Sequence, residues 1–133
     1  MKTKIFFALL ALSAVAFVGC RSHKTDFPYP VKRTVAAASA NDVRDAILRA
    51  GARLGWTMRE SAPGVIDATL TVRTHFVASE IRYTDKDFSI FYKSSENMNF
   101  DPADGKVHKS YNRWTKNLAK EISAELRSAE IGD

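Results

Sequence analysis

The chain has 133 residues, of which 45% are hydrophobic and 26% charged, and its formal net charge is +5. This length suits one ordinary globular domain, and the charge is too small and too dispersed to indicate a nucleic-acid-binding protein. The single cysteine, Cys20, excludes a disulfide within the chain. A lone cysteine close to the N-terminus therefore needs another explanation.

The first 19 residues have the pattern of a signal peptide. Lys2 and Lys4 form a positive region, and residues 5–18 are an almost unbroken apolar run. A helix of that length spans about 21 Å, which is shorter than the roughly 30 Å core of a bilayer. The pattern therefore predicts a cleaved export signal and not a membrane-spanning helix.

The sequence FVGC at residues 17–20 resembles the bacterial lipobox, in which a small residue precedes a cysteine that receives a diacylglyceryl group. Cleavage would expose the Cys20 amine for a further acyl chain, and two or more acyl chains anchor a protein stably. Phe17 departs from the lipobox, which usually has Leu there. An alternative cleavage site is AVA at residues 14–16, which suits ordinary signal peptidase but leaves Cys20 unexplained.

Cleavage before Cys20 leaves 114 residues and a net charge near +3, because Lys2 and Lys4 leave with the signal. The next residue is Arg21 and not Asp, which in the enteric lipoproteins that this segment resembles favours transfer to the outer membrane. We therefore expect a protein of the bacterial cell envelope, facing the periplasm and held by lipid on Cys20, with residues 20–30 as a tether. Basic residues of this region could contact anionic headgroups, although a soluble tether explains them equally well: Arg21, Lys24, Lys32 and Arg33.

The domain is expected over residues 31–133. Residues 31–36 have some β character and could form a first strand. Residues 39–42 resemble a capping box, and apolar residues then recur at helical spacing up to Leu54. Because Gly55 suits the position just after a helix end, the pattern predicts a helix over residues 40–54.

Four strands with alternating apolar and polar residues follow, separated by turns near residues 63–64, 74–75 and 85–86. Folding the chain about residues 74–75 places Asp67 opposite Arg82 on the solvent face. All three hairpins place their apolar side chains on the same face of the sheet, so the alternation predicts an antiparallel four-stranded meander.

The other two hairpins give equally definite registers. Folding about residues 85–86 pairs Tyr83 with Phe88. A three-residue loop at residues 62–64, with a bulge, brings Trp56 and Met58 onto the inner face. These pairs all join apolar side chains on one side of the sheet.

A second helix is expected after the polar residues 94–106, on a stripe made by Val107, Tyr111, Trp114, Leu118, Ile122 and Leu126. Trp114 stands in the middle of this stripe, and we expect it to pack on Leu70, Ile81 and Ile90. The resulting fold class is α+β, a four-stranded antiparallel meander with two helices packed on one face. The pattern leaves open whether an N-terminal segment adds a fifth strand.

The start of this helix reads H-x-x-Y-N-x-W at residues 108–114. Together with residues 55–56 and the turn at residues 63–64, it resembles a family of small uncharacterised bacterial lipoproteins. The resemblance covers about two-thirds of the chain and implies a lipobox and a compact α+β domain. It implies no activity, ligand or site.

No group of residues indicates catalysis, and we predict no catalytic residue, no metal and no cofactor. The three histidines, His23, His75 and His108, share no metal-ligand spacing. Asp101 and Asp104 are better explained by turn formation than by a calcium loop. No nucleophile elbow or Gly-rich phosphate loop occurs.

Two candidate binding regions remain. One is the open sheet face, where aromatic side chains stand among polar ones: Phe91, Phe76 and Arg82. The other is the start of the last helix, with His108, Tyr111 and Asn112. The first suits a non-enzymatic envelope lipoprotein that binds a partner protein or an envelope component, and the second a small-ligand carrier or a hydrolase. A pocket lined by His108 would favour the second interpretation, and a filled core the first.

The lipidation of Cys20 can be tested by mass spectrometry of the N-terminal peptide of the mature protein. We expect a peptide that begins at Cys20 and carries a diacylglyceryl group and an acyl chain. An unmodified peptide that begins at Phe17 would contradict this prediction.

Overall fold

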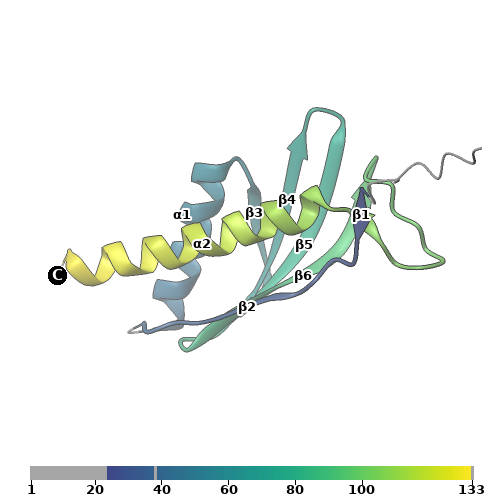
Figure 1. The fold of residues 1–133 in the computed structure, drawn as a ribbon. Coiled ribbons are helices and arrows are strands. Elements are labelled where there is room, and N and C mark those ends of the chain that lie inside the picture. Colours follow the sequence, from purple (N-terminus) through teal and green to yellow (C-terminus); the bar gives the residue numbers. More distant parts are fainter. Residues whose placement is uncertain (1–23, 38, 133) are drawn as a thin grey trace, which may run out of the picture.

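The computed structural model describes residues 24–37 and 39–132, which form an α+β domain (Figure 1). Its elements in chain order are β1 (Thr25–Asp26), β2 (Val31–Thr34), α1 (Ala40–Leu54), β3 (Thr57–Ala62), β4 (Val65–Val72), β5 (His75–Tyr83), β6 (Asp87–Glu96), β7 (Val107–His108) and α2 (Ser110–Ile131). The predictions for the signal peptide and Cys20 lie outside the described residues.

The main sheet is antiparallel and has five strands, in the order β2-β6-β5-β4-β3. The α+β class and the meander β3 to β6 are confirmed, and β2 adds the fifth strand beside β6. Both helices lie on one face of this sheet (Figure 1). The short strands β1 and β7 form a separate two-stranded ribbon.

Helix α1 has the bounds that the sequence predicts, because both of its ends are specified by local chemistry. The Asp42 backbone N–H donates to Ser39 Oγ (3.2 Å), which satisfies one of the free donors of the first turn. At the other end Gly55 adopts a left-handed φ of 79°, where a side chain would be strained. Between these ends the buried face of α1 is built from Val43, Ala46, Ile47 and Ala50.

The two outer hairpins of the meander have the predicted registers. Tyr83 pairs with Phe88 across the β5–β6 turn. In the β3–β4 hairpin the bulge lies between Glu60 and Ala62, and Pro63 and Gly64 form the turn. Trp56 is buried as expected, and Met58 packs against the core.

The predicted register of the central hairpin is wrong. The β4–β5 turn is at Arg73 and Thr74, one residue earlier than expected, so Asp67 lies opposite Glu80 and Arg82 lies opposite Val65. The resulting shift is two residues, and a two-residue shift leaves every side chain on the same face of the sheet. The alternation of apolar and polar residues therefore cannot distinguish the two registers.

Helix α2 begins at Ser110, because Val107 belongs to β7. The rest of the predicted stripe is buried, except that Trp114 is only partly buried and borders a cavity with Leu54, Trp56, Leu70, Val72 and Asn117. Leu70 is thus a neighbour of Trp114 as expected, but the central position of Trp114 is not confirmed. Helix α2 packs along α1 as well as on the sheet. The sequence pattern does not predict how the two helices are arranged relative to each other on the covered face of the sheet.

One buried hydrogen bond joins α2 to the sheet. Ser79 on β5 and Tyr111 on α2 are both fully buried, and their hydroxyl oxygens lie 2.9 Å apart. Burial raises the pKa of Tyr111 to about 12, so the phenol stays protonated at neutral pH. The pair places α2 at one position along β5, because each buried hydroxyl is the hydrogen-bond partner of the other.

Removing one hydroxyl leaves the other buried without a partner, so removing both should destabilise the protein by less than the sum of the two single changes. We expect Ser79→Ala to lower the free energy of unfolding by about 1–3 kcal/mol, because the Tyr111 hydroxyl is then buried without its partner. Tyr111→Phe should have a similar effect, and the double variant should cost less than the sum of the two. Urea denaturation of the four proteins measures this coupling, and strictly additive losses would contradict it.

Candidate functional site

The face of the sheet opposite the helices is not covered by any other element in the part of the chain that the structure describes (Figure 1). On this face Phe91 is partly buried, and its ring centroid lies 5.6 Å from the Arg82 guanidinium. Arg82 also forms an ion pair with Glu80, the residue opposite Phe91. An aromatic ring thus lies among paired charges.

A cavity of about 360 Å³ opens on the same face, over the strands β3 to β6. Phe76 and Ala78 provide apolar walls, and Asp67 lies between Lys93 and Arg59, with both N–O distances 3.2 Å. The hydrogen bond from Lys93, followed by that from Arg59, lowers the pKa of the Asp67 carboxyl. This cavity therefore combines an apolar wall with a fixed carboxylate and two cations.

The candidate residues Phe76 and Phe91 do not form one patch. Phe91 lies opposite Glu80, which is four residues from Phe76 along β5. At about 3.4 Å per residue, the two aromatic positions are roughly 14 Å apart along the sheet. The outer face thus has two separate features, the ring of Phe91 beside Arg82 and the cavity at Phe76.

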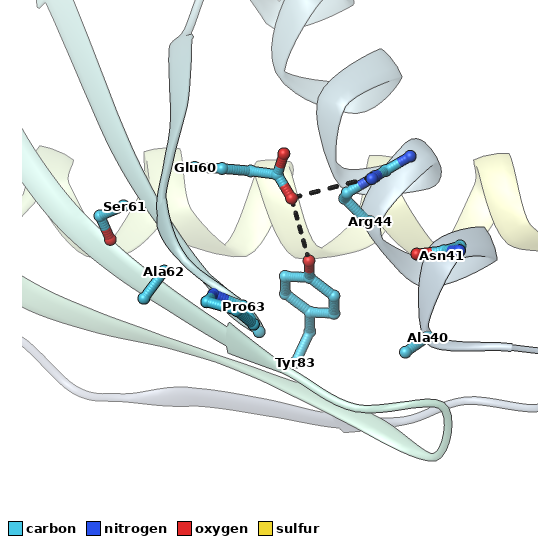
Figure 2. A pocket seen from close by; sticks show the side chains of 9 residues that line it. Ala40, Asn41, Arg44, Glu60, Ser61, Ala62, Pro63 and Tyr83 are labelled. Carbon is cyan, nitrogen blue, oxygen red and sulfur yellow. Dashed lines mark hydrogen bonds and ion pairs between the residues drawn. The ribbon is translucent and has the colours of Figure 1, made fainter.

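A larger cavity of about 520 Å³ lies between the start of α1 and the β3–β4 turn (Figure 2). Within it the Tyr83 hydroxyl donates to Glu60 Oε1 (3.3 Å), and Arg44 Nε lies 4.0 Å from the same oxygen. Burial, and then the Glu60 charge, raise the pKa of Tyr83, which keeps the phenol protonated. Arg44 also forms an ion pair with Asp45 (3.0 Å). The polar groups of this cavity are therefore hydrogen-bonded or ion-paired with one another.

The start of α2 does not form the expected ligand site. Tyr111 is fully buried against Ser79. The Asn112 side chain is buried too, and its amide accepts from the Tyr29 N–H (3.1 Å) and donates to the Phe27 carbonyl (2.8 Å). The Tyr111 hydroxyl and the Asn112 amide therefore form their hydrogen bonds within the protein.

Residues 24–30, which the sequence pattern assigns to the tether, are bound to the domain by these contacts. Thr25 and Asp26 pair with His108 and Val107 in the β1–β7 ribbon. The Lys109 N–H also donates to the Lys24 carbonyl (2.8 Å). A two-residue strand has no periodicity, so no sequence signal could have indicated it.

His75 and His108 are brought together although they are 33 positions apart, with ring centroids 6.3 Å apart. His75 Nδ1 lies 2.6 Å from the Asn97 carbonyl oxygen and therefore donates to it, whereas His108 Nδ1 accepts from the Ser110 N–H (3.2 Å). His108 thus satisfies a backbone donor at the start of α2. Within residues 24–37 and 39–132, no group of three or more His, Cys, Asp or Glu side chains could hold a metal ion.

Comparison with known protein families and with curated proteins finds no match for this chain. The likeness to small bacterial lipoproteins, based on the motif at residues 108–114, therefore stays a prediction. Among the residues that the structure describes, no helix is long and apolar enough to cross a bilayer.

The environment of His108 makes the stability of the domain depend on pH. Burial, followed by the charges of His75, Lys109, Lys24 and Arg113, lowers the pKa of His108 below its usual 6.5. The unfolded chain then binds this proton more readily than the folded protein does. Stability from neutral His108 is complete above pH 6.5 and is lost as the pH falls through 6.5 towards the folded-state value.

We therefore expect urea denaturation to show lower stability at pH 5 than at pH 7.5, and a smaller difference for His108→Asn. The asparagine oxygen can still accept from the Ser110 N–H but does not titrate. The pKa of Asp67 lies below 3.8, so that carboxylate stays charged throughout this range. An equal pH dependence in both proteins would mean that His108 is not the responsible group.

Proposed function

We propose that the chain is a lipid-anchored protein of the bacterial envelope whose domain is a non-enzymatic binding module. The observation that carries the choice of a binding module is the filled start of α2. Tyr111 is fully buried and the Asn112 amide holds backbone groups of residues 24–30. This packing favours a structural role for the conspicuous motif at residues 108–114.

The anchoring part of the proposal rests on the sequence. An apolar run ends in FVGC, and Cys20 is the only cysteine of the chain. Arg21 after the cysteine favours the outer membrane, with the domain in the periplasm. Exposure to such a compartment is compatible with a domain that has no other thiol.

The outer sheet face is the surface that we propose for a partner protein or envelope component. Phe91 beside Arg82 and the cavity around Phe76 and Asp67 are its two features. Both signs of charge alternate there, since Asp67 and Glu80 each stand next to cations. A surface of mixed charge with aromatic groups suits another protein better than a polyanion.

The alternative, a small-ligand carrier or a hydrolase with its site near His108, Tyr111 and Asn112, has less support. The cavity at the start of α2 is lined by Asn112 but not by His108 or Tyr111. His108 is engaged with a backbone N–H, and its pKa is lowered. These residues offer no free nucleophile with an adjacent base.

The binding proposal can be tested by photo-cross-linking in intact cells, with a photoreactive amino acid placed at Thr69 on the outer face or at Arg127 on α2. We expect discrete protein adducts from position 69 and none from position 127. Adding Phe91→Ser should weaken the adduct at position 69 by about tenfold if Phe91 anchors the partner. The same change should lower the free energy of unfolding by no more than about 1 kcal/mol, because Phe91 lies outside the core.

Adducts from position 127 alone would show that the helix face, and not the sheet, meets the partner. A loss of folding in Phe91→Ser would show that the assignment of the two sheet faces is wrong. Thr71→Ser on the same face is the matched control, because it keeps a hydroxyl and should change neither result.

A further inference from the structure

Exposed aromatic side chains gather where the described chain begins. Phe27 and Tyr29 are 46% and 53% exposed, and their ring centroids lie 6.4 Å apart. The Lys106 ammonium lies 5.3 Å from the Phe27 ring centroid. Phe100, in the neighbouring loop, is 44% exposed and stacks on Tyr92. Exposed aromatic rings that group together mark an interaction surface more often than single exposed rings do.

Basic side chains surround these rings. A groove of about 450 Å³ beside Tyr29 is lined by Lys109, Arg113 and Lys116 on one side of the first turns of α2. The backbone of Lys24, a further basic residue, lies beside Lys109, because its carbonyl accepts from the Lys109 N–H. The acidic groups nearby are Asp26, which lines the groove, Asp104, which lies 3.9 Å from Lys106, and Asp101, whose backbone pairs with that of Lys106. The cations outnumber these carboxylates.

We use the name "aromatic–basic end" for Phe27, Tyr29, Lys106, Lys109, Arg113 and Lys116. This end is also where the chain enters the domain, whereas the C-terminus lies at the far end of α2 (Figure 1). Cys20 is four residues before Lys24, and at about 3.5 Å per residue it can lie no more than roughly 14 Å from it. A lipid on Cys20 would therefore keep a membrane surface within reach of the aromatic–basic end.

We propose that the aromatic–basic end docks on the anionic headgroup layer of the membrane. The proposal rests on the proposed lipid anchor, which supplies the local concentration. Aromatic rings with polar neighbours favour the level of the headgroups, and Lys and Arg close to the surface are attracted to anionic lipid. Docking at this end turns α2 away from the membrane. The outer sheet face, which lies along the side of the molecule, then remains open to a partner.

The test uses the full mature protein purified from cell membranes, in vesicles of phosphatidylethanolamine and phosphatidylglycerol that contain a doxyl-labelled lipid quencher. A fluorophore is placed on Ala103→Cys, in the exposed loop next to Lys106, or on Ile131→Cys at the end of α2. We expect several-fold stronger quenching at position 103. At position 131 it should be almost absent, because the helix separates that site from the docked end by about 30 Å.

Charge reversal in the groove provides the decisive comparison. Lys109→Glu with Lys116→Glu should reduce quenching at position 103 to the level at position 131. Helix stability should not be lost, because a carboxylate at position 109 is favourable at the helix N-terminus and Glu has about the same helix propensity as Lys at position 116. The matched control, Lys120→Glu with Arg127→Glu, makes the same change in net charge farther along α2. It should leave the quenching pattern intact.

Flotation of the same vesicles separates this proposal from the anchoring proposal. Protein that floats in 1 M NaCl, with equal quenching at both positions at low salt, would overturn docking and leave the anchor standing. Protein that floats only at low salt, with strong quenching at position 103, would overturn the anchor and support docking. Protein that never floats would overturn both.

Discussion

The side-chain amide of Asn112 fixes where the chain enters the domain, and the geometry of the proposed anchor depends on it. Its oxygen and nitrogen bond to the backbone at Tyr29 and Phe27, 83 and 85 residues away in the sequence. Because Asn112 is buried, removing the amide would leave these backbone groups without partners at a cost of about 1–3 kcal/mol. Together with the β1–β7 ribbon, this clamp holds the exit of the N-terminal segment at the start of α2.

A second constraint is that the helices cover only one face of the sheet. Within the described residues, apolar side chains fill the covered face, and the buried hydrogen bond between Ser79 and Tyr111 joins the sheet to α2. The other face carries charges that pair within the sheet, such as Asp67 with Lys93 and Arg59. We therefore propose that the aromatic–basic end meets a membrane surface and that the uncovered sheet face meets a partner.

Local chemistry explains which elements could be predicted from the sequence. Helix α1 is predicted correctly because Ser39 and Gly55 specify its ends. The β5–β6 hairpin is predicted correctly because the polar residues Asp85 and Lys86 mark its turn, which pairs Tyr83 with Phe88. The β4–β5 register is missed because Arg73, in a left-handed conformation, gives no recognisable turn signal. The partial exposure of Trp114 depends on the position of α1, which no local pattern encodes.

The candidate sites were predictable only in part, because most of their contacts join distant segments. Strand alternation is enough to place Phe91 and Arg82 on the outer face. The predicted β5–β6 register also places Phe91 opposite Glu80, four residues from Phe76, so the roughly 14 Å between the two aromatic positions could have been predicted as well. His75 and His108 come together because the His108 N–H donates to the Met98 carbonyl, beside the Asn97 carbonyl that His75 contacts. The Asn112 contacts join α2 to residues 27 and 29, which no local pattern predicts.

The central claim is that one end of the domain faces the membrane and the sheet face stays open. Hydrogen–deuterium exchange of the lipidated protein, measured on anionic vesicles and in detergent, tests this claim most directly. The account predicts that vesicles slow exchange in residues 24–30 and 97–113 and leave strands β3 to β5 unchanged. Slower exchange in those strands, with residues 24–30 unaffected, would show that the sheet face rests on the membrane and would contradict the account.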